Sequence, residues 1–279
     1  MKILVTDGNG YIGKAFIRKY ERTFDIVVPK SDVNLLDAHS VDALFKANKF
    51  DAVLHLANVP EKADGRFIET DNLIMFHNLQ YVCAKYGIKK LIVVSDAADF
   101  DRTQELIDVT EEMAEYYVPS DGYGYARNVI NTLAAKDKIT TILRVFEVYG
   151  GVGSTAMNKI AAAAMRGKKR ILLDCEKTVS AVSLDDLIKV AAAFLQGDYP
   201  KGDYNVVCGE KTTLLTVARA MRRAVRRDEG DIAIELKRDE VGMEYSASNS
   251  KLLSVLPFRF TPINRGIKTL CDEAVSRRK

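Results

Sequence analysis

"KILVTDGNGYIG", residues 2–13, decides the fold. An apolar run leads into Gly8, Gly10 and Gly13, whose spacing is G-x-G-x-x-G, and a helical pattern follows over residues 12–20. Glycines at this spacing let the backbone approach a pyrophosphate closely and seat it at the N-terminus of the helix. Because the turn lies between a predicted strand and a predicted helix, we interpret it as a dinucleotide-binding turn, the alternative being a glycine-rich turn without a ligand. Asp7 is unusual here, since it brings a negative charge to the entrance of an anion site.

Short apolar runs alternate with helical patterns as far as residue 166. Strands are predicted at residues 2–6, 25–29, 52–57, 91–95 and 140–146, and helices at 12–20, 40–48, 70–86, 123–136 and 155–166. The strands are apolar throughout instead of alternating, as expected when helices cover both faces of a parallel sheet. The sequence therefore predicts an α/β, doubly wound parallel sheet (Rossmann fold), with ligands at the carboxyl ends of its strands.

The pattern becomes less regular beyond residue 150. Strand-like runs occur at 169–174, 204–207 and 232–237, and a well-marked helix covers 182–197. We expect a dinucleotide-binding domain over residues 1–150 and a smaller mixed substrate lobe over 151–279, with helix 182–197 returning to the first domain.

Composition narrows the class of protein. The 279 residues hold 41 Lys and Arg against 38 Asp and Glu, a net charge of +3 that does not favour a nucleic-acid or membrane surface. The basic run 221–227 is interpreted as a solvated helix face, with phosphate binding as the alternative. The four cysteines are widely spaced, so we expect free thiols. No signal pattern, membrane span or metal-ligand spacing of histidines is recognisable, so we expect a cytoplasmic protein without a metal site.

Several further motifs occur in a characteristic order. They are "NLLD" (34–37), "FDAVLHLAN" (50–58), "GIKKLIVVS" (87–95), "YGYAR" (123–127), "LRVFEVYG" (143–150), "VSLDDL" (182–187) and "YNVVCGEKTTL" (204–214). Together with the glycine turn, they resemble the extended short-chain dehydrogenase/reductase family, which includes nucleotide-sugar epimerases, dehydratases and reductases. Members usually read T-G-G-x-G-x-I-G at the turn, so the three glycines match while Asp7 replaces a fourth. The resemblance covers most of the chain and implies a nicotinamide cofactor.

The resemblance also implies which residues contact that cofactor. They are Asp7, Gly8, Asn9, Gly10, Tyr11, Ile12, Gly13, Lys30, Asn34, Leu35, Leu56, Ala57, Asn58, Asn72, Tyr123 and Arg127. An NAD enzyme normally has Asp or Glu about 20 residues after the glycines, to hold the ribose 2′-hydroxyl. This chain has Lys30 and Ser31 there, which suit a 2′-phosphate, so NADP is slightly preferred over NAD. The alternative is that Lys30 is a solvated loop lysine, and an Asp7 carboxylate turned to the ribose hydroxyls fits NAD better.

The family reaction implies a catalytic set of which this chain keeps only part. A tyrosine gives or takes the hydroxyl proton at a sugar carbon, a lysine four residues later lowers its pKa, and a Ser or Thr orients the substrate oxygen. Here Tyr123 is present, but Arg127 replaces the lysine, and Asp96 stands at the Ser or Thr position with Ser95 one residue earlier. A carboxylate beside Tyr123 raises its pKa and opposes the arginine. Direct pairing of Asp96 with Arg127 would explain both departures as one change.

Other departures from the family pattern narrow the reaction. Dehydratases carry an Asp-Glu pair where this chain has Ala97 and Ala98, so dehydration is not expected. Glu147 replaces an asparagine near the expected substrate diphosphate, and its charge would repel that anion. We therefore expect an NAD(P)-dependent oxidoreductase or epimerase acting on a nucleotide sugar or a related carbonyl compound. The alternatives are an NAD(P)-binding sensor or scaffold that has lost catalysis, and an enzyme that uses Asp96 as general base.

The resemblance finally implies a homodimer. Its interface would be a four-helix bundle built from a helix at residues 102–117 and the helix that carries Tyr123. The expected partner is otherwise a small-molecule substrate.

Overall fold

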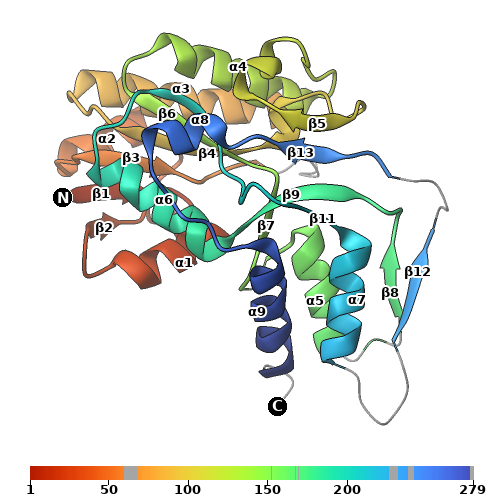
Figure 1. The fold of residues 1–279 in the computed structure, drawn as a ribbon. Helices are drawn as coiled ribbons and strands as arrows, with labels where there is room; N and C mark the ends of the chain where they lie inside the picture. Colours follow the sequence, from red (N-terminus) through yellow and green to blue (C-terminus); the bar gives the residue numbers. More distant parts are fainter. Residues whose placement is uncertain are drawn as a thin grey trace.

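A six-stranded parallel sheet forms the centre of the protein (Figure 1). The computed structural model describes residues 1–59, 68–151, 153–166, 168, 170–225, 232–237 and 242–276. The sheet runs in the order β10 (Gly202–Asn205), β6 (Thr140–Val145), β4 (Leu91–Asp96), β3 (Ala52–His55), β1 (Lys2–Val5) and β2 (Asp25–Val27). Every pair in it is parallel. The predicted doubly wound α/β fold is confirmed.

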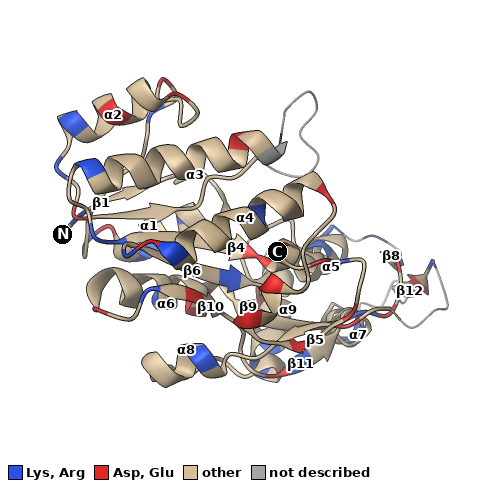
Figure 2. Cartoon of the chain, turned by 90° about the horizontal axis from the view of Figure 1, so that it is seen from above, with Lys and Arg blue, Asp and Glu red and all other residues tan. Residues whose placement is uncertain are grey.

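Helices cover both faces of this sheet, which is why its inner strands β1, β3 and β4 are mainly apolar. On one face lie α2 (Ala38–Ala47), α3 (Ile68–Lys85) and α4 (Gly122–Lys136), and Figure 2 shows α3 and α4 side by side. On the other face lie α1 (Tyr11–Tyr20) and α6 (Leu184–Gln196) (Figure 1). Helix α6 packs on the parallel sheet, with Leu187, Ile188 and Val190 buried.

The strand order changes direction beside β1. This strand pairs with β2 on one side and with β3 on the other, so the connections on its two sides run in opposite directions. In open parallel sheets, ligands bind at the carboxyl ends of the strands where the order reverses. The glycine turn follows β1 and residues 56–59 follow β3, so both segments lie at this position.

A second layer of strands forms the smaller mixed lobe. Its main sheet has the order β11 (Lys211–Thr213), β9 (Thr178–Ser183), β13 (Tyr245–Ala247) and β5 (Leu106–Val109), and β7 (Glu147–Tyr149) also pairs with β9. A separate ladder joins β8 (Arg170–Leu173) to β12 (Ala233–Leu236). The helices α5 (Ala156–Met165), α7 (Leu214–Ala224) and α9 (Ile263–Ser276) share one hydrophobic core, while α8 (Ser250–Val255) packs on the first lobe.

The structure corrects the helix predicted at residues 102–117. This segment instead forms β5 and a short 3-10 helix, η2 (Glu111–Glu115). Leu106 and Val109 are buried at a spacing of three residues, which imitates a helical pattern. They remain extended because β5 pairs with β13, and Asp108 between them has a left-handed backbone with φ 48°. The run "YNVV" also differs from its assignment to the second lobe, because β10 is an edge strand of the parallel sheet.

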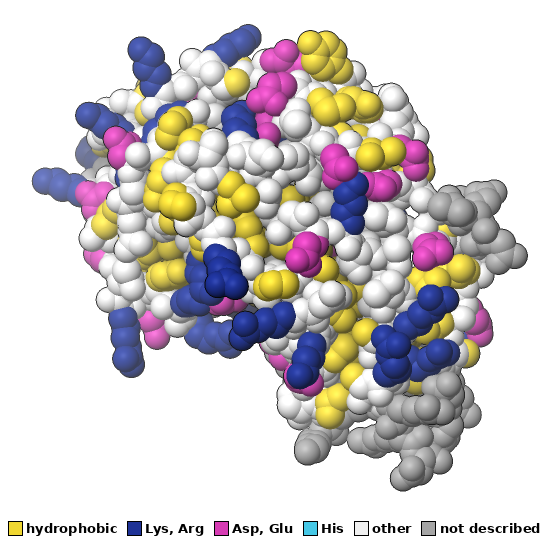
Figure 3. All heavy atoms as spheres, in the orientation of Figure 1, with side chains coloured by type: hydrophobic (Ala, Val, Ile, Leu, Met, Phe, Trp, Pro, Cys, Tyr) yellow, Lys and Arg dark blue, Asp and Glu magenta, His cyan; other side chains and the backbone are white. Residues whose placement is uncertain are grey.

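Charged side chains are distributed over both lobes. In Figure 2, positions of both charge signs are scattered along elements of both lobes, and Figure 3 shows side chains of both signs on one face. In the basic run 221–227, Arg223 is exposed on α7, whereas Arg226 and Arg227 lie outside the described residues. All four cysteines are free thiols, as predicted. Within the described part of the chain, no helix has the length and hydropathy needed to cross a membrane.

Candidate active site

The side chains around Tyr123 come from three elements that meet at one edge of the sheet. The Tyr123 hydroxyl donates to Asp96 Oδ2 at 2.7 Å and accepts from Asn58 Nδ2 at 3.0 Å. Asp96 ends β4, Asn58 follows β3, and Tyr123 lies in the first turn of α4. Arg127 lies one turn further along α4, with Nε and Nη2 each 3.4 Å from the same hydroxyl. The structure thus brings Tyr123, Asp96 and Arg127 together, as the sequence suggested, and adds Asn58.

The start of α4 is fixed locally, which sets the position of Tyr123. Asp121 caps the helix by accepting from the Gly124 backbone N–H at 2.8 Å. Gly124 lies so close to the Ala98 carbonyl that a Cβ at this position would overlap it. The helix therefore packs directly on the segment that follows Asp96, and this contact holds the phenol against the carboxylate.

Electrostatics keep the Tyr123 phenol protonated. Tyr123 is only 7% exposed, and burial, together with the Asp96 carboxylate, raises its pKa to about 12. Arg127 acts in the opposite direction but does not outweigh these two effects. The guanidinium is itself buried and lies 5.4 Å from the centre of the Tyr123 ring. At neutral pH the hydroxyl is accordingly a proton donor, with Asp96 as its acceptor.

Two expectations about Asp96 and Ser95 differ from the geometry. In the part of the chain that the structure describes, no ion pair joins Asp96 directly to Arg127; both contact the Tyr123 hydroxyl instead. The tyrosine thus lies between the two charges because the guanidinium stacks along its ring. Ser95 is buried and donates to Asp99 at 2.8 Å, so its hydroxyl is committed to a different group.

A cavity of about 470 Å³ opens beside Tyr123. Its lining residues are Asn58, Asp96, Ala97, Ala98, Arg102, Tyr123, Phe146, Glu147, Ser154, Thr155, Ala156, Lys177, Val179, Leu214 and Tyr245. The two alanines that replace the dehydratase pair face this cavity, so the acid groups of that pair are missing from the site itself. The volume is that of a small-molecule site, and both lobes contribute to its walls.

Glu147 and Lys177 bring opposite charges to the cavity. Glu147 accepts from the Met157 backbone N–H at 2.7 Å, at the beginning of α5, and burial raises the pKa of its carboxyl. Lys177 lies over the Tyr245 ring with Nζ 3.4 Å from its centre, and burial lowers its pKa. The carboxylate is therefore held by a helix N-terminus, while Lys177 and Arg102 give the cavity positive charge.

The glycine turn has the close packing that a dinucleotide requires. A Cβ at Gly13 would overlap the Asp7 carbonyl and the Gly8 Cα, and a Cβ at Gly8 would overlap Val28 and Ile17. Helix α1 begins at this turn with Gly10 as its N-cap, and no side chain caps it. Its first N–H groups are thus available to an anion, so the residues present fit the pyrophosphate of a nicotinamide cofactor.

Asp7 occupies the position of the missing glycine. Its backbone is left-handed, with φ 51°, a conformation that Asp adopts more readily than most residues. Its carboxylate lies against the Gly10 Cα, in the space that a Cβ would fill. Partial burial raises the pKa of Asp7, and Lys14 opposes this rise. The carboxylate therefore lies at the beginning of α1, close to where an anion would bind.

The other predicted cofactor residues are placed around the same strand ends. The Thr6 hydroxyl accepts from the backbone N–H groups of Leu56 and Ala57, each at 2.9 Å, which joins the ends of β1 and β3. Asn72 bonds both backbone groups of Val59 at 3.0 Å and so fixes the segment after β3.

The segment after β2 carries the remaining predicted positions. Asn34 bonds the Leu36 N–H within its own turn, the Asn78 amide donates to the Leu35 carbonyl, and Lys30 is exposed. Asn9, Tyr11 and Ile12 belong to the turn and the first residues of α1; the Tyr11 hydroxyl donates to the Gly150 carbonyl at 2.5 Å.

Sequence reasoning missed a buried ion network below the site. Arg144 is fully buried on β6 and contacts Asp99 at 2.8 Å, Asp203 at 2.9 Å and Asn205 at 3.0 Å. Because Asp99 also accepts from Ser95, this network ties β4, β6 and β10 together under the active-site edge. The only sequence signal was an arginine inside an otherwise apolar strand pattern.

The chain is similar in sequence to known proteins. A model of the "NAD dependent epimerase/dehydratase family" matches residues 3–207. UDP-arabinose 4-epimerase 1 of Arabidopsis thaliana is 23% identical over 286 residues, covering 80% of this chain and 67% of that protein. UDP-glucose 4-epimerase of Caenorhabditis elegans is 28% identical over 112 residues, covering 38% of this chain and 31% of that protein. The chain spans about half the length of two further Arabidopsis thaliana relatives that it matches.

Solved structures share the fold over the whole chain. The GDP-mannoheptose C4 reductase from Campylobacter jejuni with NADP bound has a TM-score of 0.83 at 18% identity, covering 99% of this chain and 98% of that one. The UDP-glucose 4-epimerase from Thermotoga maritima with UDP-glucose has a TM-score of 0.81 at 20% identity, covering 100% of both chains.

Proposed function

The chain belongs to the NAD dependent epimerase/dehydratase family, and on that premise we propose that it is an NAD(P)-dependent oxidoreductase or epimerase acting on a nucleotide sugar or a related carbonyl compound. One observation carries this proposal. The Tyr123 hydroxyl lines a cavity of substrate size and is bonded to Asp96 and Asn58 at the carboxyl edge of the sheet.

Tyr123 acts as the acid or base. When bound, the nicotinamide ring supplies or accepts a hydride at a substrate carbon. In the reduction of a carbonyl, the neutral phenol of Tyr123 gives its proton to the substrate oxygen, and Arg127 and Asn58 stabilise the phenolate that remains. In the oxidation of an alcohol, Tyr123 takes the hydroxyl proton while its own proton passes to Asp96. Because the raised pKa of Tyr123 keeps the phenol protonated at neutral pH, we propose that the protonation state suited to carbonyl reduction predominates.

The residues around the glycine turn would hold the cofactor. Gly8, Gly10 and Gly13 would allow the pyrophosphate to approach the N-terminus of α1. By the resemblance to the family, the segment at residues 56–58 would border the nicotinamide ribose. Exposed Lys30 after β2 supports NADP over NAD, since a cation there suits a 2′-phosphate.

The cavity suits an anionic substrate in spite of Glu147. The Glu147 carboxylate is bonded at the start of α5, so it does not act as a free anion toward the substrate. We propose that Arg102 and Lys177 face the diphosphate of a nucleotide sugar. Dehydration is not part of the proposal, because Ala97 and Ala98 supply no acid or base.

Hydride exchange tests this function directly. The protein is incubated with a panel of UDP-, GDP- and dTDP-linked sugars, including 4-keto forms, and with NADPH or NADH carrying deuterium at C4; deuterium in the sugar is measured by mass spectrometry. We expect transfer with the wild type and a loss of about 10²- to 10⁴-fold in Tyr123→Phe. Tyr116→Phe is the control, because Tyr116 is 82% exposed and lies outside the cavity. Equal transfer in Tyr123→Phe and wild type would contradict the assigned role.

A second candidate is an NAD(P)-binding sensor or scaffold without turnover. It is favoured by the raised pKa of Tyr123, which makes the phenolate of the family mechanism hard to form. Saturable binding of NADPH with no deuterium transfer to any sugar of the panel would support this candidate over the enzyme.

We also propose a homodimer in the cytoplasm, with an interface different from the predicted one. Since residues 102–117 form no long helix, the pair α3 and α4 is the surface to consider. Ile74 and Tyr81 on α3 and Tyr125 and Leu133 on α4 are apolar side chains exposed to solvent, which suits a second copy. Light scattering of Tyr81→Glu and Leu133→Glu should then give the monomer mass; a dimer in both variants would contradict this surface.

A further inference from the structure

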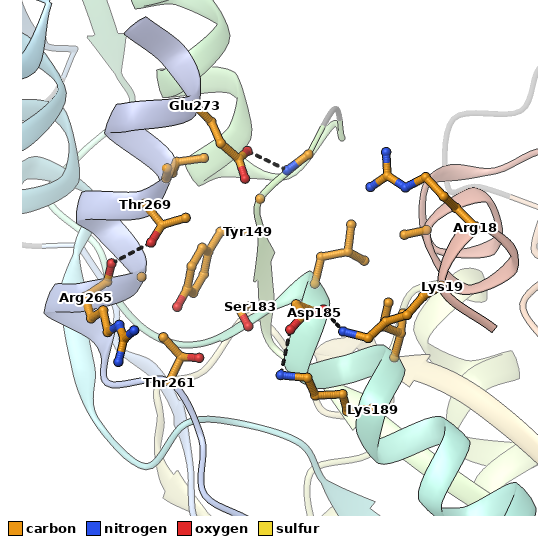
Figure 4. A pocket seen from close by; sticks show the side chains of 17 residues that line it. Arg18, Lys19, Tyr149, Ser183, Asp185, Lys189, Thr261, Arg265, Thr269 and Glu273 are labelled. Carbon is orange, nitrogen blue, oxygen red and sulfur yellow. Dashed lines mark hydrogen bonds and ion pairs between the residues drawn. The ribbon is translucent and has the colours of Figure 1, made fainter. Parts of the chain in front are cut away.

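A larger cavity lies on the opposite side of the lobe interface from Tyr123. Its volume is about 810 Å³, and α1, α6, α9 and the end of β7 form its walls (Figure 4). None of the residues proposed for the cofactor or the reaction lines it, and it shares no residue with the cavity beside Tyr123. Cavities of this size hold small molecules. It is therefore a separate candidate site, and it does not depend on the proposed function.

Its walls carry an excess of positive charge. Arg18 and Lys19 come from α1, Lys189 from α6 and Arg265 from α9, against the carboxylates of Asp185 and Glu273. In Figure 4, α1 and α9 face each other across the cavity, so Arg18 and Arg265 stand on opposite walls. Lys and Arg side chains border the notch between the two lobes in Figure 3.

The two arginines differ from the two lysines in their partners. Asp185 binds both Lys19 and Lys189, the latter at 2.6 Å, so these three charges largely satisfy one another. Glu273 accepts from the Gly151 backbone N–H at 3.2 Å. Among the described residues, Arg18 and Arg265 have no side-chain ion pair. Two guanidinium groups are thus available to a ligand on either side of the cavity.

Tyr149 is a second feature of the cavity wall, with an unpartnered buried hydroxyl. It is 2% exposed, it lines the cavity, and its hydroxyl has no hydrogen-bond partner. Gly266, next to Arg265 on α9, lies beside this hydroxyl. Only glycine fits at this position, because a Cβ would overlap the Tyr149 hydroxyl oxygen. Buried hydroxyls nearly always have a partner. Burial also raises the pKa of Tyr149, so the group stays a donor.

We propose that this cavity is a second binding site for a small phosphorylated molecule with negative charge at both ends, of the size of a sugar bisphosphate. Arg265 and the Tyr149 hydroxyl hold one phosphate, and Arg18 holds the other across the cavity. Guanidinium groups match phosphate oxygens with paired hydrogen bonds, and a phosphate accepts from a phenol as well. The hydroxyls of Ser183, Thr261 and Thr269 on the walls suit the sugar between them.

Calorimetry with fructose 1,6-bisphosphate as the probe tests the site, with fructose and inorganic phosphate in parallel. We expect saturable binding of the bisphosphate, weaker binding of phosphate and none of fructose. Arg18→Gln and Arg265→Gln should each weaken the bisphosphate by about 10- to 100-fold, since each removes one charge-assisted contact. Arg219→Gln is the matched control, an exposed arginine on α7 away from the cavity, and should leave binding unchanged.

Tyr149→Phe separates a ligand contact from a structural role. Because the hydroxyl has no partner in the free protein, this variant should unfold at the same temperature as the wild type or a higher one, while binding weakens about 5- to 10-fold. A lower unfolding temperature with unchanged affinity would overturn the role of Tyr149.

Other outcomes would overturn the site as a whole. They are no binding of the bisphosphate up to about 10 mM, equal weakening by Arg219→Gln, or equal affinity for fructose. Loss of binding in Lys177→Gln would also overturn it, because the probe would then occupy the cavity beside Tyr123.

Discussion

Replacing Asp96 with Asn should lower the pKa of Tyr123. Burial and the carboxylate together raise this pKa from 10 to about 12, and Arg127 opposes the rise. With the hydroxyl 2.7 Å from Asp96 Oδ2, removal of the negative charge leaves burial as the main cause, partly offset by the guanidinium. We expect the pKa of Tyr123 to fall by about 1 to 2 pH units, which corresponds to about 1.4 to 2.7 kcal/mol for ionising the phenol.

The assay is a pH titration by NMR of protein labelled at tyrosine Cζ. The chain has 12 tyrosines, so the Tyr123 resonance is assigned by its absence in Tyr123→Phe. Asp96→Asn keeps the size of the side chain and an oxygen that can accept from the hydroxyl, so the contact itself is preserved. Asp121→Asn is the matched control, because this carboxylate caps the same helix without contacting the phenol.

The role given to Asp96 would be refuted if the titration midpoint of Tyr123 were the same in Asp96→Asn and wild type, with the other tyrosine signals unchanged. That result would mean that burial alone raises the pKa of Tyr123 and that the charge of Asp96 does not contribute. An equal fall of the Tyr123 pKa in Asp121→Asn would instead mean that a change at the N-terminus of α4 causes the shift.

Three further predictions concern stability and the cofactor turn. Arg144→Met should lower the free energy of unfolding in urea by about 3 to 5 kcal/mol, because Asp99 is left buried without its partner. Arg170→Met is the control and should lower it by under about 1 kcal/mol, because the ion pair of Arg170 with Glu235 is exposed. Similar losses in both variants would contradict this. The pKa of Tyr123 is raised to about 12, so its contribution to the free energy of unfolding is complete below pH 10 and is lost as the pH rises toward 12. Between pH 10 and 12, the free energy of unfolding of Tyr123→Phe should therefore fall by about 2 to 3 kcal/mol less than that of the wild type. The same pH dependence in both proteins would contradict this. Asp7→Gly should tighten NADPH about tenfold in calorimetry, because the carboxylate lies against Gly10 at the start of α1; weaker binding would show that Asp7 holds the ribose instead.

The parallel sheet was predictable because local pattern and tertiary environment agree there. Strands such as β3, buried at every position, can only be covered on both faces. Gly13 is required by close backbone contacts, and Gly8 by close contacts with the side chains of Val28 and Ile17. The mixed lobe was harder to predict. Strand β5 keeps only its two end residues buried, and its pairing with β13 joins residues more than 130 positions apart, which no local pattern encodes.

The members of the candidate site were more predictable than their contacts. The resemblance to the family singled out Tyr123, Arg127 and Asp96, and the spacing of four residues placed Tyr123 and Arg127 on one face of a helix. Sequence could not show that Ser95 turns to Asp99, because this depends on the buried Arg144 network from another strand. Nor could it show the role of Asn58, whose amide reaches Tyr123 only once β3 and α4 are packed.

The two departures from the family pattern, Asp96 and Arg127, act on the same oxygen with opposite sign. A lysine without a nearby carboxylate would favour the phenolate, whereas here burial and Asp96 outweigh Arg127 and favour the phenol. A donor that starts protonated suits a reaction in which the substrate oxygen gains a proton, and it has Asp96 beside it as the acceptor for the reverse direction. In the mechanism proposed above, the substitutions therefore change which protonation state of Tyr123 begins the reaction. They leave Tyr123 lining the cavity of about 470 Å³.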